Sequence, residues 1–140
     1  NVKVKLSDVS VKDWKTVGMP AEAANAIDGD PQTVWTAKAL TPLVVDMGKA
    51  SEVIGFSYAP AQKEDLTGTI YKYNFYVSID GKNWTKCDAS GEFSNIMHNP
   101  VPYFVRFGKK YPARYFKLEP AAEINNKPAT TVGEVGILLK

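Results

Sequence analysis

A strict alternation of side-chain types between residues 71 and 79 is the clearest pattern in this chain. Tyrosine, phenylalanine, valine and isoleucine occupy every second position, and mostly polar residues lie between them: Tyr71, Tyr73, Phe75, Val77 and Ile79 against Lys72, Asn74, Tyr76 and Ser78. A strand with one buried face shows this period of two. The next segment, Asp80-Gly81-Lys82-Asn83, predicts a tight turn that returns into a short strand over residues 84–87.

Other apolar runs predict further strands. They cover residues 9–17, 43–47, 53–58, 101–107, 114–119 and 132–139. Prolines fall between most of these runs, and only residues 21–27 look helical, a segment too short to be stable alone. Many short strands with almost no helix predict an all-β, antiparallel sandwich or barrel. No internal repeat or linker is visible, so we expect one domain over residues 1–140.

The composition is that of an ordinary globular domain. The 140 residues are 44% hydrophobic and 23% charged, which suits a chain with one sizeable core. The net charge of +2 is small and the basic residues are scattered, so we expect no nucleic-acid partner. No apolar run approaches the ~20 residues that cross a bilayer, and we expect no membrane partner. The chain begins Asn-Val-Lys-Val-Lys, without an apolar leader, and we interpret it as a domain of a longer, processed protein.

The residues that most often carry catalysis are scarce. Cys87 is the one cysteine, which excludes an intrachain disulfide and favours a bacterial chain; we expect it to be a half-buried strand residue. One histidine and one cysteine without a recognisable flanking motif do not form a catalytic pair. A glycosidase needs two carboxylates across a cleft, and no such pair is apparent. We therefore expect that the domain itself is not an enzyme.

The richest local motif runs from Asn25 to Trp35. Asp28 and Asp30 flank Gly29, and Thr33 follows three residues after the second carboxylate. Calcium takes six to eight oxygens from carboxylates, hydroxyls and backbone carbonyls of a tightly curled loop, and a glycine lets the loop curl. The spacing is not that of an EF-hand. An Asp-Gly turn capped by its own side chains has the same composition, so spacing alone leaves both interpretations open.

This motif and the segments after it resemble, in order, the motifs of discoidin (coagulation factor 5/8 type C) domains and of family 32 carbohydrate-binding modules. The similar segments cover nearly the whole chain: residues 24–35, 45–48, 54–60, 73–84, 91–96, 113–116 and 133–135. The resemblance implies a discoidin-like jelly roll, the sandwich of the galactose-binding-domain-like fold. It extends to accessory domains of Bacteroides-type glycosidases, both α-L-fucosidases and β-N-acetylhexosaminidases of the chitobiase kind. That implies a glycan and the parent's catalytic domain as partners, in the periplasm or outside the cell.

The resemblance also implies a structural calcium ion at the acidic turn. Carried over residue by residue, its side-chain ligands are Asp28, Asp30, Thr33 and Glu134, with the carbonyls of Asn25, Thr33 and Gly133 completing the shell. Such an ion joins the acidic turn to the last strand.

Family 32 modules that bind galactose-like sugars use loops at one end of the sandwich. They place a histidine, an arginine and an asparagine at positions that correspond here to Thr36, Ala61 and Thr67, so all three differ. A methyl group cannot make the hydrogen bonds of an arginine, and specificity for galactose is not expected without a replacement. Neighbouring loop residues are the remaining ligand-binding candidates: Lys38, Gln62, Lys63, Asn95, His98 and Asn99.

Several alternatives stay open. A structural spacer or a protein-docking domain of the same parent enzyme also accounts for the missing sugar-binding residues. Membrane-docking relatives expose apolar side chains on long loops, which here carry Leu40, Leu66 and Ile96-Met97. A lone loop histidine such as His98 is often a solvated bystander. We expect the three tryptophans, Trp14, Trp35 and Trp84, in the core, and Tyr103 and Tyr111 packed on strands.

Overall fold

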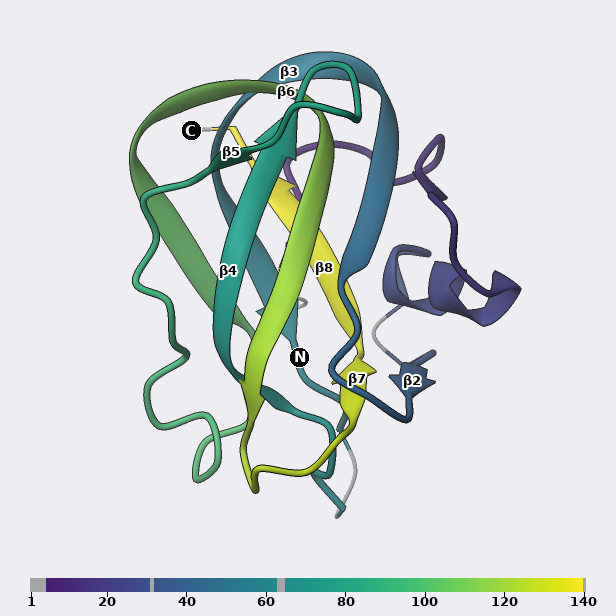
Figure 1. Ribbon diagram of the computed structural model, residues 1–140, viewed down its shortest axis with the longest axis vertical. Coiled ribbons are helices and arrows are strands. Elements are labelled where there is room, and N and C mark those ends of the chain that lie inside the picture. Colours follow the sequence, from purple (N-terminus) through teal and green to yellow (C-terminus); the bar gives the residue numbers. More distant parts are fainter. Residues whose placement is uncertain (1–4, 31, 63–64, 140) are drawn as a thin grey trace.

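The fold is organised by two long, bent strands that pair with each other. The computed structural model describes residues 5–30, 32–62 and 65–139, and β3 (Leu43–Ala59) runs antiparallel to β6 (Tyr103–Glu123). Their register shifts between Asp46 and Ser51 and again between Val53 and Gly55. Such irregularities bend strands and increase their twist. One sheet therefore folds over itself into two facing layers, as Figure 1 shows, which confirms the predicted antiparallel sandwich.

The other elements extend these layers. They are β1 (Lys15–Thr16), the 3-10 helix η1 (Ala21–Ala26), β2 (Trp35–Ala37), β4 (Ile70–Ser78), β5 (Thr85–Lys86), β7 (Thr130–Val132) and β8 (Glu134–Leu138). The first half of β3 and the second half of β6 form one layer with β1, β4 and β5. The remaining halves form the second layer with β8. β2 and β7 pair separately at one end.

Aromatic rings from both layers fill the core. Phe56 of β3 is fully buried and stacks on Phe75 of β4 with 4.1 Å between ring centroids. Phe93, from the segment after β5, stacks on Tyr58 and Tyr73. Tyr73, Phe75 and Val77 of the predicted alternation are buried, which confirms the centre of the pattern. The prediction is wrong at its two ends: Tyr71 is half-buried, and Ile79 lies beyond the end of β4 and is 52% exposed.

The predicted strand over residues 9–17 is wrong apart from Lys15–Thr16, which pair with β3. The segment before it covers the free edge of β8 instead. The amide of Asp8 donates to the carbonyl of Ile137 at 2.7 Å, and its carboxylate accepts from the amide of Leu139 at 2.9 Å. Asp8 pairs with backbone groups at the edge of β8 through isolated hydrogen bonds, one of them from its side chain. The segment therefore forms no continuous ladder with β8. An unpaired edge invites other strands, and this segment blocks it.

Two strands predicted over residues 101–107 and 114–119 are one strand, β6. Pro112 lies within it opposite Glu52, close to the register shift, and Pro120 lies opposite Tyr73 beside a second shift. A proline lacks the amide that a regular ladder requires, but an irregular position does not need that amide. The prolines therefore mark bends in this strand and do not separate strands.

The expectation of three core tryptophans is correct for two of them. Trp14 and Trp35 are buried. Trp84 is only half-buried, on the outer face of the sheet, with the ammonium of Lys117 4.7 Å from its ring centroid. It precedes the two-residue strand β5 at the edge of the sheet, where no second layer covers it. Cys87 is buried and not half-buried.

The turn between β4 and β5 forms as predicted. The Asp80 carboxylate accepts hydrogen bonds from the amides of Lys82 and Asn83, both at 2.8 Å. Gly81 has a φ of 77°, and a Cβ at this position would lie 3.1 Å from the ring of Tyr115. The turn therefore packs its backbone directly on the outer face of β6.

We expect Asp80→Asn to destabilise the domain near neutral pH and to have a smaller effect in acid. The amides of Asn83 and Lys82 hold the pKa of Asp80 well below its ordinary value. The stabilising contribution is complete above the pKa of an unfolded aspartate, about 3.9, and is lost as pH falls toward the lower folded-state pKa. Urea unfolding of both proteins at about pH 6 and about pH 2.5 measures it. An equal difference at both pH values would contradict this explanation.

Candidate functional site

The acidic turn curls around the hydroxyl of Thr33. This oxygen lies 2.8 Å from the carbonyl of Asp30 and 3.3 Å from the carbonyl of Asn25, and it contacts the Asp28 carboxylate. One hydroxyl proton satisfies one acceptor, so several oxygens converge here with few protons between them. The two carboxylates also accept backbone amides within the turn, at Asp30 and Gln32, as the capped-turn interpretation requires.

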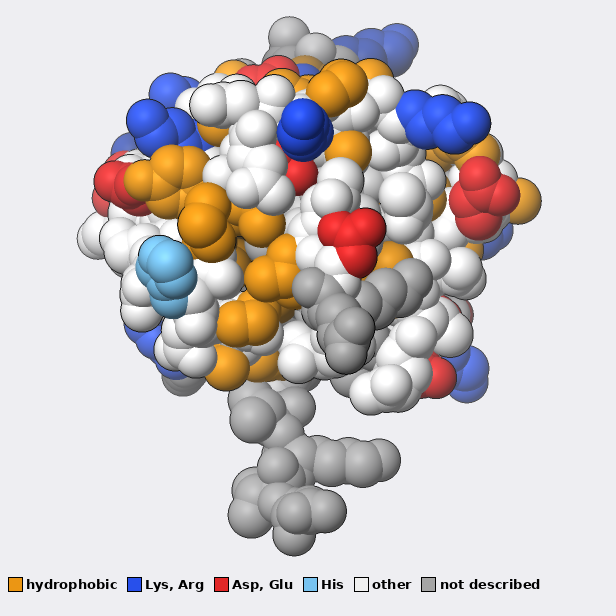
Figure 2. All heavy atoms as spheres, turned by 90° about the horizontal axis from the view of Figure 1, so that it is seen from below, with side chains coloured by type: hydrophobic (Ala, Val, Ile, Leu, Met, Phe, Trp, Pro, Cys, Tyr) orange, Lys and Arg blue, Asp and Glu red, His pale blue; other side chains and the backbone are white. Residues whose placement is uncertain are grey.

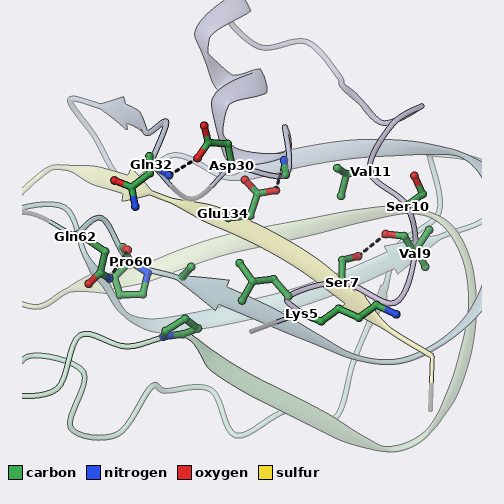
Figure 3. A pocket seen from close by; sticks show the side chains of 14 residues that line it. Lys5, Ser7, Val9, Ser10, Val11, Asp30, Gln32, Pro60, Gln62 and Glu134 are labelled. Atoms are coloured by element: carbon green, nitrogen blue, oxygen red, sulfur yellow. Dashed lines mark hydrogen bonds between the residues drawn. The ribbon is translucent and has the colours of Figure 1, made fainter. Parts of the chain in front are cut away.

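Glu134 brings a third carboxylate to this turn from the start of β8. Its side chain is only 2% exposed, and one oxygen, Oε2, accepts the amide of Gly29 at 2.9 Å. The other oxygen, Oε1, is buried without a hydrogen-bond partner. Figure 3 shows the carboxylate directed toward the turn that carries Asp30. A buried carboxylate oxygen without a partner is costly, and a bound cation removes that cost.

Electrostatics at this position disfavour the charged form of Glu134. Burial is the main cause that raises its pKa to about 8, with the carboxylates of Asp28 and Asp30 adding to it and the Gly29 amide opposing it. A cation among these three side chains would reverse the balance, because it favours the deprotonated form of each.

The donor set fits a hard cation that binds oxygen. Carboxylate, hydroxyl and carbonyl oxygens are the ligands that calcium prefers. Across the described ranges, no three His, Cys, Asp or Glu side chains are grouped as the ligands of one metal ion. Binding would therefore depend on the hydroxyl of Thr33 and on carbonyls as well. Gly133, the residue before Glu134, lies against the backbone at the end of β3. A Cβ at this position would lie 2.8 Å from the carbonyl of Ala59, so only glycine permits this close approach of the two segments.

An open cavity of about 880 Å³ lies beside the acidic turn. The N-terminal segment over residues 5–11 forms one wall, Gly29, Asp30 and Gln32 form another, and Glu134 lies between them (Figure 3). Of the sugar-binding candidates that the structure describes, only Gln62 lines this cavity. The structure thus places part of the predicted metal site and one predicted sugar residue around a single hollow.

The other sugar-binding candidates lie on loops at one end of the sandwich. Thr36, Lys38, Thr67, Asn95, His98 and Asn99 are exposed. Ala61 is 2% exposed, because it continues the buried end of β3, so its side chain offers no surface to a ligand and its inclusion among the candidates was wrong. Lys63 lies outside the described residues.

Hydrogen bonds tie these loops together. The side-chain amide nitrogen of Gln62, Nε2, donates to the carbonyls of Pro60 and Pro100, at 3.1 and 3.0 Å. The Tyr103 hydroxyl donates to the carbonyl of Asn99 at 3.0 Å. The segment before β6 is therefore fixed to the end of β3, and His98 and Asn99 are presented on a braced loop.

Glu123 organises a second pair of loops at this end, and sequence reasoning missed it. Its buried carboxylate accepts three backbone amides, from Gly68 at 2.8 Å, Asn125 at 2.5 Å and Lys127 at 2.9 Å. These amides belong to two loops far apart in the sequence. The bond from the amide of Asn125, two residues after the glutamate, follows the local pattern of an acidic side chain that caps the next turn. The contact with Gly68 has no sequence signal.

Apolar side chains are also exposed near the loop end. Leu40, Met97, Val101 and Phe104 each expose 41–43% of their surface, and Figure 2 shows apolar groups gathered on this face beside the single histidine, His98. Of the other apolar loop residues noted from the sequence, Leu66 is half-buried and Ile96 is fully buried. Among the described residues, no helix has the length and apolar character needed to cross a membrane.

Comparison with known proteins gives a consistent family match. The family model described as the F5/8 type C domain matches residues 5–135. Galactose oxidase of Gibberella zeae is 29% identical over 143 residues, covering 94% of this chain and 20% of that protein. This chain therefore spans about a fifth of the length of that relative.

Solved structures share the fold. A CBM32 module from Clostridium perfringens, in complex with GalNAc-β-1,3-galactose, superposes with a TM-score of 0.78 at 22% identity, over 93% of this chain and 98% of that module. An α-L-fucosidase candidate from Bacteroides ovatus superposes with a TM-score of 0.75 at 33% identity, over all of this chain and 20% of that protein.

Proposed function

The chain belongs to the F5/8 type C domain family, and from this premise we propose that it is a non-catalytic glycan-binding module of a larger glycoside hydrolase. The similar modules are small relative to the enzymes that contain them, as the match to one fifth of the Bacteroides ovatus protein illustrates. The name of the Clostridium module gives a glycan as its ligand. An extracellular or periplasmic location follows from such a parent.

We propose the braced loop end as the glycan site, and the Gln62 bridge is the observation that supports it most. A sugar needs planar polar groups for its hydroxyls and an apolar surface for its C–H face. Asn99 and His98 supply polar groups, and Met97 and Val101 supply exposed apolar surface next to them. Because Gln62 and Tyr103 hold these loops in place, little loop ordering opposes binding.

The absence of a catalytic role follows from how the acidic residues are used. Asp28, Asp30 and Glu134 each accept a backbone amide of the turn. Glu123 is saturated by three backbone amides. Asp30 and Glu134 line one cavity, but we assign them to the proposed cation and not to the acid/base pair that glycoside hydrolysis requires.

We also propose a structural calcium ion at the acidic turn. Asp28, Asp30, Thr33 and Glu134 would bind it through side chains, and the carbonyls of Asn25, Thr33 and Gly133 would complete the shell. The partnerless Oε1 of Glu134 supports this assignment. The ion would link the turn before β2 to the start of β8, and so stabilise the sandwich without taking part in chemistry.

Titration of the isolated domain with glycans tests the proposed site. We expect galactose, fucose, N-acetylglucosamine or longer glycans to shift the amide resonances of residues 36–38, 62 and 95–99. The dissociation constant should be about millimolar, because a shallow exposed site offers few contacts. His98→Ala and Asn99→Ala should weaken binding severalfold, whereas Lys109→Ala, at the opposite end, should not change it.

The outcomes separate the alternatives. Shifts confined to the cavity beside Glu134 would show that the site is wrongly placed. No shift with any glycan would favour a spacer or a protein-docking domain. Turnover of aryl glycosides that persists after repurification, and that disappears on replacing one carboxylate, would contradict the non-catalytic assignment.

A further inference from the structure

The outer face of the layer formed by β4, β5 and β6 presents a cation held between two aromatic rings. Lys117 of β6 points outward, and its ammonium lies 4.7 Å from the ring centroids of both Tyr76 and Trp84. All three side chains are half-buried, so the rings restrict the lysine without covering it. This arrangement is distant in sequence from the loop-end candidates and plays no part in the proposed glycan site.

Strand register fixes the neighbours of this cation. Tyr76 pairs with Lys117 on one side and with Lys86 of β5 on the other. The two lysines therefore flank one tyrosine across three adjacent strands, roughly 10 Å apart at the backbone. Because cross-strand partners point to the same face, Lys86, Tyr76 and Lys117 form one row on the surface.

The carboxylates on this face are already occupied. Glu119 accepts the side-chain amide of Asn74 at 3.0 Å and the Tyr76 hydroxyl at 3.4 Å. Asp46 is bound by the guanidinium of Arg114, at 2.9 and 3.0 Å. Within the described part of the chain, neither Lys117 nor Lys86 has a carboxylate within ion-pair distance. The donors to Glu119 are neutral and leave its charge in place, so two lysines are offset by one carboxylate, and the row keeps a net positive charge beside the two rings.

We propose that this face is a second binding site, for a polyuronate chain. Trp84 and Tyr76 would pack against the C–H surface of a sugar ring, and Lys117 and Lys86 would pair with carboxylates of neighbouring uronates. The charge complementarity selects an acidic polysaccharide over a neutral one. The flat, outward face of the strands suits an extended chain, and the rings hold Lys117 in position before binding, which lowers the entropy lost on pairing.

Titration with tetragalacturonate, followed by NMR and calorimetry, tests this proposal. We expect shifts of the Trp84 indole and of residues 76, 86 and 117, and weaker binding as salt rises, because exposed charge pairs are screened. Lys117→Gln should weaken binding about fivefold, the upper end for one exposed ion pair. Trp84→Ala should also weaken it, and Lys86→Gln provides an exposed variant whose folding is not in question.

Lys109→Gln is the matched control, because Lys109 also lies over a tyrosine, 5.2 Å from the ring centroid of Tyr111, but it is outside the row of Lys86, Tyr76 and Lys117, and its charge acts on the carboxylate of Asp88. It should change affinity by less than about twofold, as expected for a screened charge that the ligand does not contact. Equal losses in Lys109→Gln and Lys117→Gln, equal binding of the methyl-esterified ligand, or no binding would overturn the proposal. Shifts of this face by poly-glutamate but not by tetragalacturonate would indicate a polypeptide partner and would also overturn it. Because His98→Ala should leave this binding unchanged, the two proposed sites succeed or fail separately.

Discussion

Removal of calcium should lower the thermal midpoint of the domain, and Glu134→Gln should abolish most of that effect. An ion that binds only the folded chain stabilises it by mass action, by about 4 kcal/mol at a concentration 1,000 times its dissociation constant. Glu134 supplies a buried oxygen with no other partner, so its loss should affect the ion more than any exposed ligand does. Differential scanning calorimetry with excess calcium and with chelator measures the shift.

The control for this experiment is Glu52→Gln, an exposed carboxylate of β3 far from the turn in sequence. It should keep the full calcium dependence. In chelator, Glu134→Gln should be no less stable than the original chain, because a neutral amide in this position avoids the cost of a buried charge. Identical melting curves with calcium and with chelator, for the original chain, would rule out the ion.

The acidic turn shows how far the sequence leads toward a site. Asp28, Gly29, Asp30 and Thr33 lie within six residues, so local spacing predicts that their oxygens converge. The contribution of Glu134 rests on the family resemblance, since 100 residues separate it from the turn and nothing local links the two. Its burial and its partnerless oxygen are visible only when β8 is placed beside the turn.

Other features depend on long-range packing and were not predictable in this way. Ala61 is buried although it lies two residues beyond the end of β3, at a position where the sequence predicts an exposed loop. Tryptophan is a residue type typical of a core, but Trp84 lies at a sheet edge that no second layer covers. Glu123 has no pattern of its own, yet it fixes two loops of the candidate site. The sequence predicted strands near these positions, but neighbouring segments determined where the strands end and what these side chains contact.

The loop-end site and the lysine–aromatic face make different demands on the fold. The loop end is held by single hydrogen bonds such as that from Gln62 to Pro100. The face depends on strand register between β4, β5 and β6, which the core packing on its other side maintains. Core substitutions should therefore disturb both sites only through global unfolding, and surface substitutions should separate them.

The largest loss of stability is expected for Phe56→Ala. Phe56 is fully buried between the layers, with Phe75 at 4.1 Å, Tyr73 at 5.3 Å and Phe93 at 6.1 Å between ring centroids. Truncation removes these contacts and leaves a cavity that rigid rings on both sides cannot fill. A phenylalanine-to-alanine change in a core costs about 3–5 kcal/mol. That is a large fraction of the roughly 5–15 kcal/mol that separates folded from unfolded states in most domains.

Phe104→Ala provides the matched control, because Phe104 lies three residues from the buried Phe107 on β6 but exposes 43% of its surface, on the opposite side from the core. Its removal should change the free energy of unfolding by no more than about 1 kcal/mol, since an exposed ring loses few contacts. Urea unfolding of the three proteins gives the comparison, with an unchanged slope for a two-state transition. If Phe56→Ala lowers the free energy of unfolding no more than Phe104→Ala does, the stacked rings do not dominate the stability of the core. The strands shared by the two layers must then hold the layers together.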